Sequence, residues 1–354
     1  MLILNIAEFD KNLKVETSIS KDDIVWLNAA EAPFVVYGAT GTDPYMRMPD
    51  DVAKTVSPGV LALSKNTAGI RVRFRTNSPY IAIHCKWNHL GHMPHMPLSG
   101  SSGFDIYRYN NNNQIYAGTF MPSPSSHKGY ESLKELYSNK ITDYIINFPL
   151  YNCVDKLYIG ISKNAEFETP AKYKFDLPVV FYGSSITQGG CAARPGNCYQ
   201  NFLSRALDID YVNLGFSGNG KAEDTMIDYL KNLNMSVFVS DYDHNAPTCE
   251  HLQNTHFKLY KEIREKNPDL PYIMLSKPDY HVGNAVDDER RNIVMESFIK
   301  AKHSGDKNVY FVDGASLFQA DEWFACTVDG CHPTDLGFYR FAQALIPTFK
   351  TIFK

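Results

Sequence analysis

Several features that would mark other classes of protein are scarce in this sequence. Its apolar runs, such as those within 177–182 and 236–240, fall far short of the roughly 18 residues of a membrane-spanning helix. Lysine and arginine total 35 against 39 acidic residues and form no dense cluster. That argues against nucleic acid as the main partner, because binding to its backbone needs clustered cations.

Signs of secretion are also scarce. No basic leader precedes the first apolar stretch, and seven cysteines do not make a fully paired disulfide framework. We therefore expect a cytoplasmic chain with reduced thiols. A secreted protein whose leader had been removed would look similar, and Cys191 with Cys198 or Cys326 with Cys331 could then pair.

What is present is the composition of a folded globular chain. Its 354 residues are 44% hydrophobic and 21% charged, which predicts one large domain or two ordinary ones. Aromatic residues reach 13%. This content suits β-structure and sugar- or acyl-binding surfaces, and core packing explains it equally well.

The first half of the chain has the rhythm of β-strands. In 70–75, apolar residues alternate with arginines, which predicts a strand with one face inward and its arginines in water. Similar segments, separated by turn-rich pieces, occur at 59–64, 80–87, 103–109, 114–120, 141–148 and 156–161. Many short strands between turns predict a jelly-roll-like β-sandwich over residues 1–175.

The second half, residues 176–354, alternates apolar strands with helix-length segments. The strand candidates are 179–182, 211–214, 237–240, 272–275 and 309–312. The helix candidates lie near 198–207, 222–233, 249–266, 286–303 and 335–350. Five such units predict a parallel sheet covered by helices, with the boundary between the halves within 166–177.

Small residues follow the first strand of this second half. The segment 181–190 reads FYGSSITQGG, at the place where α/β sheets commonly bind ligands. A phosphate-binding loop would need a Gly-Lys-Ser/Thr ending, and no lysine is present. A serine exposed at the end of the strand, with small neighbours that admit a substrate, fits the segment better.

A base for that serine is available at the other end of the chain. Asp329 and His332 follow the fifth strand, three positions apart. A serine needs a base within hydrogen-bond reach, and the base needs a partner that fixes its tautomer. Loops that follow parallel strands emerge at one edge of the sheet, so this pair is expected near Ser185.

Acyl transfer also requires donors for an oxyanion. The second strand ends in NLGFSGNG at 213–220, where glycine can present a bare N–H group. The third ends in DYDHN at 241–245, where an asparagine amide can point to the same place. Asp241 and Asp243 could also be read as a metal pair, although acidic residues often cap a strand end.

This constellation resembles the SGNH (GDSL-like) hydrolase superfamily of esterases and acylhydrolases. The motifs that carry the resemblance are YGSSITQGG at 182–190, NLGFSGNG at 213–220, DYDHN at 241–245 and DGCHPTDLG at 329–337. In the first half, GSSGFDIY at 100–107 is similar to the Gly-x-Asp-Leu-Tyr β-domain that precedes some of these hydrolases, with Ile106 in place of leucine.

The resemblance implies a flavodoxin-like three-layer α/β/α fold and no cofactor. It assigns Ser185 as nucleophile with Asp329 and His332, and the Ser185 N–H, Gly218 and Asn245 as oxyanion donors. Two departures stand out. Ser184 replaces the aspartate of the Gly-Asp-Ser block, and the third block lacks its usual Gly-x-Asn-Asp form, so that Asn219 competes with Asn245.

Histidines gather in one segment of the first half. Four of the 11 lie within 84–95. The spacing of His89, His92 and His95 permits a zinc site, but it matches no standard finger. We favour no metal and expect the loop to wall the pocket near Ser185, with substrate contacts from Trp87, His92 and His95. Arg194 could contact an anionic or hydroxylated substrate, or could be solvated.

The sequence therefore predicts a serine ester hydrolase, a short-acyl (acetyl) esterase that acts on carbohydrate or a similar polar substrate. Its partners would be a small-molecule or oligosaccharide ester and, in a homo-oligomer, further copies of itself. Two alternatives stay open. One is a non-catalytic carbohydrate-binding protein on a degenerate hydrolase scaffold, and the other is a metal-dependent hydrolase that uses the His89–His95 cluster.

Overall fold

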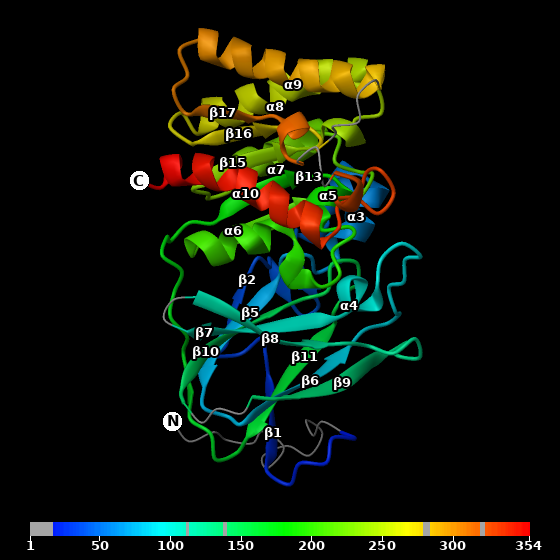
Figure 1. The fold of residues 1–354 in the computed structure, drawn as a ribbon, viewed down its shortest axis with the longest axis vertical. Helices are drawn as coiled ribbons and strands as arrows, with labels where there is room; N and C mark the ends of the chain where they lie inside the picture. The colour runs from blue at the N-terminus through cyan, green and yellow to red at the C-terminus, as the bar shows by residue number, and fades with distance from the viewer. Residues whose placement is uncertain (1–16, 111–112, 137–139, 279–283, 319–322) are drawn as a thin grey trace. The chain divides into compact units, whose positions relative to one another are not determined.

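The computed structural model describes residues 17–110, 113–136, 140–278, 284–318 and 323–354 (Figure 1). These residues form two compact units. The first unit comprises the described part of Met1–Arg47 together with Lys65–Lys172 and Arg194–Gly196. The second comprises Met48–Ser64, Tyr173–Ala193 and Asn197–Lys354. Met48–Ser64 belongs to the second unit although it lies in the first half of the sequence, and Arg194–Gly196 belongs to the first unit although it lies in the second half.

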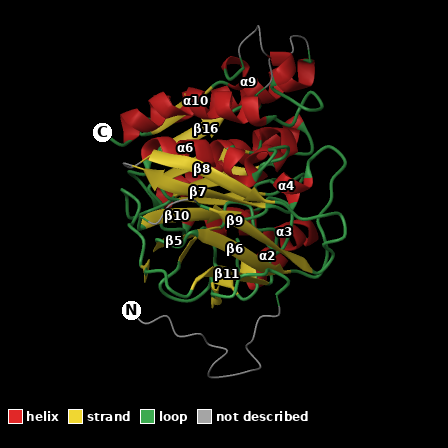
Figure 2. Ribbon diagram, turned by 60° about the horizontal axis from the view of Figure 1, so that its bottom comes forward, coloured by secondary structure: helices red, strands yellow, loops and turns green. Residues whose placement is uncertain are grey.

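The first unit is a β-sandwich, as predicted (Figure 2). Its strands are β1 (Ile24–Asn28), β2 (Val35–Tyr37), β3 (Gly41–Thr42), β4 (Tyr45–Met46), β5 (Arg71–Thr76), β6 (Tyr80–Lys86), β7 (Phe104–Asn110), β8 (Asn113–Phe120), β9 (Gly129–Glu135), β10 (Thr142–Asn147), β11 (Lys156–Ser162) and β12 (Phe167–Glu168); α4 (Leu98–Ser101) is a short helix. One sheet has the order β1-β11-β6-β9, and the other has the order β12-β5-β10-β7-β8 with β2 also paired to β5. The pairs are antiparallel, and alternate residues of both sheets meet in one core.

Two of the three arginines of β5 are not in water, contrary to the sequence-based expectation. Arg71 and Arg73 are both buried. The Arg71 guanidinium donates to the Gly69 carbonyl at 2.7 Å and lies 5.8 Å from the centre of the Tyr37 ring, while Arg73 lies 4.7 Å from the Tyr109 ring. Rings from β2 and β7 lie against these two guanidinium groups. Stacking on aromatic rings lets a planar cation lie there.

The segment 59–64 is helical and not a strand. It lies within α3 (Pro58–Ser64), which follows α2 (Asp50–Val56) in the second unit. Proline favours the first turn of a helix, where its missing N–H costs nothing. Val60 then reaches the core of the second unit together with Ala53 of α2.

Trp87 is also a correction, because it belongs to the core of the first unit and does not line a pocket. Its side chain is 3% exposed. The indole N–H donates to the Ser126 carbonyl at 2.8 Å, and the ring packs at 5.4 Å from that of Tyr130. A hydrogen-bonded indole inside a sandwich serves stability, which the sequence signal of an aromatic beside histidines did not reveal.

The second unit contains the predicted parallel sheet, in the order β14-β13-β15-β16-β17. The strands are β13 (Val179–Gly183), β14 (Tyr211–Gly215), β15 (Val237–Asp241), β16 (Tyr272–Leu275) and β17 (Val309–Val312). The longer helices are α6 (Tyr199–Leu207), α7 (Asp224–Lys231), α8 (Cys249–Lys266), α9 (Ala285–His303) and α10 (Asp335–Ile352). This is the flavodoxin-like order 2-1-3-4-5, and its switch point lies between β13 and β15.

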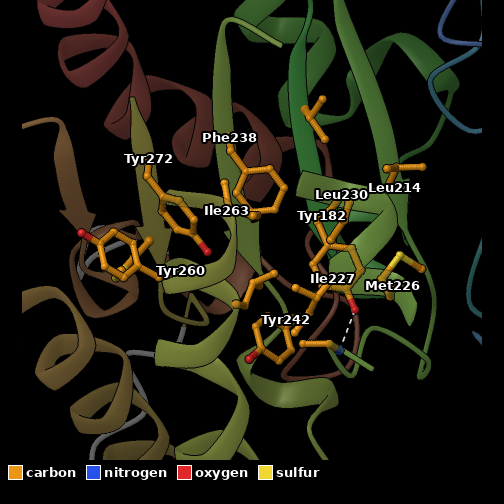
Figure 3. Packing of buried hydrophobic residues seen from close by; sticks show 14 of the residues in the cluster. Tyr182, Leu214, Met226, Ile227, Leu230, Phe238, Tyr242, Tyr260, Ile263 and Tyr272 are labelled. Atoms are coloured by element: carbon orange, nitrogen blue, oxygen red, sulfur yellow. Dashed lines mark hydrogen bonds between the residues drawn. The ribbon is translucent and has the colours of Figure 1, made fainter. Parts of the chain in front are cut away.

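Helices cover both faces of the sheet, which makes the three layers. Tyr182 of β13 packs in a core with residues of α7 and α8, and its hydroxyl accepts a hydrogen bond from the Ala222 N–H at 2.7 Å (Figure 3). Phe181 faces the other way, toward Tyr199 of α6 and Phe349 of α10. In the described part of the chain, no helix has the length and apolarity required to cross a bilayer.

We predict that Trp87→Ala lowers the free energy of unfolding by about 3–5 kcal/mol, because it removes a buried aromatic side chain and leaves a cavity. Trp87→Phe should cost less, since it keeps most of the packing and loses the hydrogen bond to Ser126. Chemical denaturation of the full chain would measure both. A Trp87→Ala protein of unchanged stability would contradict this placement of the indole.

Candidate active site

The segment around Ser185 forms a tight turn between β13 and a one-turn helix. Helix α5 (Ser185–Gln188) follows Ser184, whose hydroxyl accepts from the Ile186 N–H at 3.1 Å. The Thr187 hydroxyl accepts from the Ser184 N–H at 3.1 Å, which completes a capping box. Serine in place of aspartate at position 184 therefore preserves the cap that the turn requires.

Glycine is required just before this turn. A Cβ at Gly183 would lie 2.0 Å from the Asp241 carbonyl oxygen and 2.1 Å from the Thr187 hydroxyl. The bare backbone lets β15 and α5 approach the end of β13 closely. Ser185 then stands at the carboxyl end of the sheet with 6% of its surface exposed.

The loop before α10 presents a histidine and an aspartate to this serine. Ser185 Oγ lies 2.8 Å from His332 Nε2, and His332 Nδ1 lies 2.7 Å from Asp329 Oδ2. The other oxygen of Asp329 accepts from the backbone N–H groups of His332 at 2.8 Å and Cys331 at 3.0 Å. With the carboxylate on Nδ1–H, the lone pair of Nε2 faces the serine hydroxyl.

The environment of Asp329 favours its anion. Partial burial works against ionisation, but hydrogen bonds from the His332 backbone, the His332 ring and the Cys331 backbone outweigh it and lower the pKa of Asp329. A carboxylate that stays ionised can hold an adjacent imidazolium. The arrangement therefore suits a histidine that gains and loses a proton.

Further hydrogen bonds tie the serine loop to the histidine loop. The Cys191 N–H donates to the Pro333 carbonyl at 3.1 Å. Asp335 Oδ1 accepts from the Ala193 N–H at 2.8 Å, and its Oδ2 accepts from the Asn197 amide at 2.6 Å. Sequence reasoning missed this role of Asp335, because an acidic residue at the first position of a helix is ordinary helix chemistry.

The two loops predicted to supply oxyanion donors lie at the same edge of the sheet. Gly218 has a φ of +68°, and a Cβ built there would meet nothing within 4 Å, so space is open beside it. The Asn245 Oδ1 accepts from the Gly220 N–H at 3.4 Å, and its amide NH₂ makes no hydrogen bond to the residues that the structure describes. The amide is thus held by its oxygen and can donate from its nitrogen.

The competitor, Asn219, is already engaged. Its amide donates to the Ser217 carbonyl at 2.8 Å. Its side chain also fills the space above Gly59 of α3, where a Cβ would lie 2.0 Å from Asn219 Oδ1. The geometry therefore favours Asn245 as the donor.

Arg194 lies among protein groups of the first unit. Its guanidinium donates to Asp105 at 3.0 Å and to the Tyr107 hydroxyl, and it lies 4.1 Å from the centre of the Tyr116 ring. Asp105 is fully buried and also accepts from the Gly196 N–H at 2.8 Å. The arginine is therefore neither solvated nor an open anion site, since a buried carboxylate already neutralises it.

The histidines of 84–95 have separate environments. His84 Nδ1 lies 2.7 Å from Glu131, His89 and His92 are exposed, and His95 is half-buried. The ring nitrogens of His89, His92 and His95 do not come together as a set of three metal ligands. Substrate contact by His92 and His95 stays a prediction, as does the position of their loop relative to Ser185.

Two further sequence-based readings concern the cysteines and the acidic residues at the end of β15. All seven cysteines have free thiols. Asp243 Oδ1 accepts from the His244 N–H at 2.8 Å and Oδ2 from the Lys277 N–H at 2.9 Å. Asp243 thus joins its own turn to the segment after β16 instead of pairing with Asp241 around a metal.

Family models match both halves of the chain. Residues 176–350 match the model of the GDSL-like lipase/acylhydrolase family, and residues 24–167 match that of the N-terminus of SGNH hydrolase-type esterases. A search of curated proteins by sequence found no significant match.

Solved structures resemble more than nine tenths of the chain. A Bacteroides ovatus protein described as a GDSL-like lipase is 27% identical with a TM-score of 0.84, over 93% of this chain and 98% of that one. The salicylyl-acyltransferase SsfX3 of a tetracycline biosynthetic pathway is 17% identical with a TM-score of 0.76, over 94% and 98%. The acetyl xylan esterase Est2A of Butyrivibrio proteoclasticus is 13% identical with a TM-score of 0.55, over 93% and 98%.

The two family models together span both halves of the chain, in the order that the sequence motifs predicted. The sandwich, the parallel sheet and the serine–histidine–aspartate chain fit one and the same group of enzymes. The chain belongs to the GDSL-like lipase/acylhydrolase (SGNH) family and is a carboxylic ester hydrolase with the N-terminal β-domain of SGNH-type esterases.

Proposed function

We propose that this enzyme removes short acyl groups, acetyl foremost, from carbohydrate or another polar alcohol through an acyl-enzyme on Ser185. The observation that carries the proposal is the continuous hydrogen-bonded chain from Ser185 through His332 to Asp329. A non-catalytic carbohydrate-binding protein would have no need of that chain. A metal-dependent hydrolase would need ligands that converge, which His89, His92 and His95 do not.

The first half-reaction forms the acyl-enzyme. His332 Nε2 takes the Ser185 proton, and Ser185 Oγ attacks the ester carbonyl. The carbonyl oxygen becomes an oxyanion, which the N–H groups of Ser185 and Gly218 and the amide of Asn245 stabilise. Asp329 stabilises the imidazolium, and His332 then gives its proton to the leaving alcohol.

The second half-reaction releases the acid. Water loses a proton to His332 Nε2 and attacks the acyl carbonyl, the same donors hold the oxyanion, and Ser185 regains its proton as the acid leaves. No cofactor enters either step. The substrate class is suggested by relatives: the similar structures include the acetyl xylan esterase Est2A and a family two carbohydrate esterase from Cellvibrio japonicus, although identities of 13% and 11% carry the fold alone.

A substrate panel tests the specificity. With p-nitrophenyl esters, we expect kcat/KM for acetate to exceed that for octanoate by about tenfold or more, and acetylated oligosaccharides should release acetate. Ser185→Ala should lose several orders of magnitude in kcat on every substrate. The matched control Ser236→Ala should keep its activity, because the Ser236 hydroxyl binds the Pro178 carbonyl at the start of β15. An active Ser185→Ala enzyme would remove the mechanism, whereas preference for long acyl chains would overturn only the substrate class.

The roles of His332 and Asp329 predict unequal losses of activity. His332 is the base that takes the serine proton, whereas Asp329 holds the base. His332→Ala should be nearly as damaging as Ser185→Ala. Asp329→Ala should cost less, because its side chain is 39% exposed and water can replace part of its hydrogen bonding to the ring. A His332→Ala enzyme that keeps most of its kcat on p-nitrophenyl acetate would show that His332 is not the base.

The oxyanion assignment predicts different results for substitutions of Asn245 and Asn219. Asn245→Ala should lower kcat by about 10²–10³, the usual cost of losing one such donor. Asn219→Ala should lower it by less than about tenfold, because that amide serves the Ser217 carbonyl. Steady-state kinetics on p-nitrophenyl acetate would decide, and the opposite order of losses would move the donor to Asn219.

A further inference from the structure

A buried carboxyl group that the mechanism does not use lies directly beneath the nucleophile turn. Asp241 is the last residue of β15 and stands opposite Gly183 in the parallel pairing with β13. Its side chain is fully buried. The Thr187 hydroxyl donates to Asp241 Oδ2 at 2.8 Å, and the Tyr199 hydroxyl lies 3.3 Å from the same oxygen.

The surroundings of Asp241 are those of an uncharged acid. Its Oδ1 is buried and has no hydrogen-bond partner among the residues that the structure describes. The titratable groups that face it are Tyr199 from α6 and Asp243 from the turn after β15, and neither is a cation. An isolated buried carboxylate is costly, and an unsatisfied oxygen adds to that cost.

The carboxyl groups of Asp241 and Asp243 differ in how readily they ionise. Burial works against ionisation of Asp243, but hydrogen bonds from His244 and the Lys277 backbone outweigh it, so the pKa of Asp243 is lowered. Burial and then the charge of Asp243 raise the pKa of Asp241 to about 8. Burial also raises the pKa of Tyr199, which therefore stays a hydroxyl donor.

Asp241 reaches the nucleophile through one threonine. Thr187 Oγ1 donates to Asp241 and accepts from the Ser184 N–H, the residue before the nucleophile. The carbonyl of Thr187 is fixed separately, by amides of Asn213 at 2.7 Å and Gln200 at 2.8 Å. Thr187 is thus held by hydrogen bonds at its hydroxyl and at its carbonyl. Of these, only the bond from the hydroxyl to Asp241 involves a group that can change its charge.

We propose that Asp241 is a positioning residue of the nucleophile turn: as an uncharged carboxyl it holds the Thr187 hydroxyl and, through it, keeps Ser185 aligned with His332, and its ionisation disturbs that alignment. The inference rests on the proposed role of Ser185. It adds an alkaline limit to the activity, which the triad by itself does not create. The rate falls as Asp241 loses its proton.

The first test is the pH profile of Asp241→Asn, which keeps the shape and cannot ionise. With p-nitrophenyl acetate, and spontaneous hydrolysis subtracted, wild-type kcat/KM should fall above about pH 8, by up to about tenfold at pH 9. Asp241→Asn should keep kcat at pH 7 within about fivefold and lose the alkaline fall. A variant that keeps the fall would overturn the proposal.

A stability measurement reports on the same proton without catalysis. The pKa of Asp241 is raised by folding, so its contribution to stability is present below the unfolded pKa and is lost as pH rises through about 8. The melting temperature of the wild-type protein should therefore fall more steeply than that of Asp241→Asn between pH 5 and 9. Equal slopes would mean that Asp241 is already ionised in the native protein, which overturns the proposal.

Thr187 variants test the link to the nucleophile if Asp241→Asn does not fold. Thr187→Val should lower kcat at least about tenfold with little change in KM, and Thr187→Ser should restore it, since it returns the hydroxyl. The control is Thr255→Val, which loses a comparable bond to the Tyr242 hydroxyl and should keep its activity. An unchanged kcat in Thr187→Val would overturn the link from Asp241 through Thr187 to Ser185. If Ser185→Ala were inactive in the same assay, the proposed function would still hold.

Discussion

The hydrogen bond between Ser185 and His332 joins residues that are 147 positions apart, and the second unit is organised around that closure. The serine follows β13 in the interior of the sheet, while the chain reaches its last strand at the edge. Helix α10 crosses back to pack beside α6, where Phe341 lies 4.3 Å from the Tyr199 ring. This return brings the loop before α10 to the end of β13. Hydrogen bonds from the backbone of Cys191 and Ala193 to Pro333 and Asp335 then hold it there.

Three carboxyl groups of this site differ in charge because their hydrogen-bond donors differ. Asp329 and Asp243 each accept several N–H groups, which lowers their pKa, and both are anions in the neutral range. Asp241 receives hydroxyl donors on one oxygen and none on the other. His332 becomes positively charged during the reaction, and the anion of Asp329 lies beside its ring. The carboxyl group of Asp241, under Ser185, is uncharged.

Sequence reasoning succeeded where a single pattern decides the structure. The strands of the parallel sheet were predicted because each is a short apolar run, and β16 and β17 have the predicted bounds. It failed where tertiary surroundings decide. The alternation in β5 identified a strand but could not show that Arg73 would find an aromatic ring, and a histidine-rich neighbourhood hid the core position of Trp87. The sequence offered Asp241 only as half of a possible metal pair, because its burial and the missing donor at Oδ1 are properties of the folded chain.

The helical segment Met48–Ser64 constrains the order in which this protein can be built. Its apolar residues Met48, Ala53 and Val60 belong to the core that β13, β14 and α7 complete. A ribosome releases this segment before the sandwich strands β5 to β12 and long before its packing partners. Until those partners are made its apolar residues have no core to join, and no single cut of the gene yields two pieces that each carry a whole core.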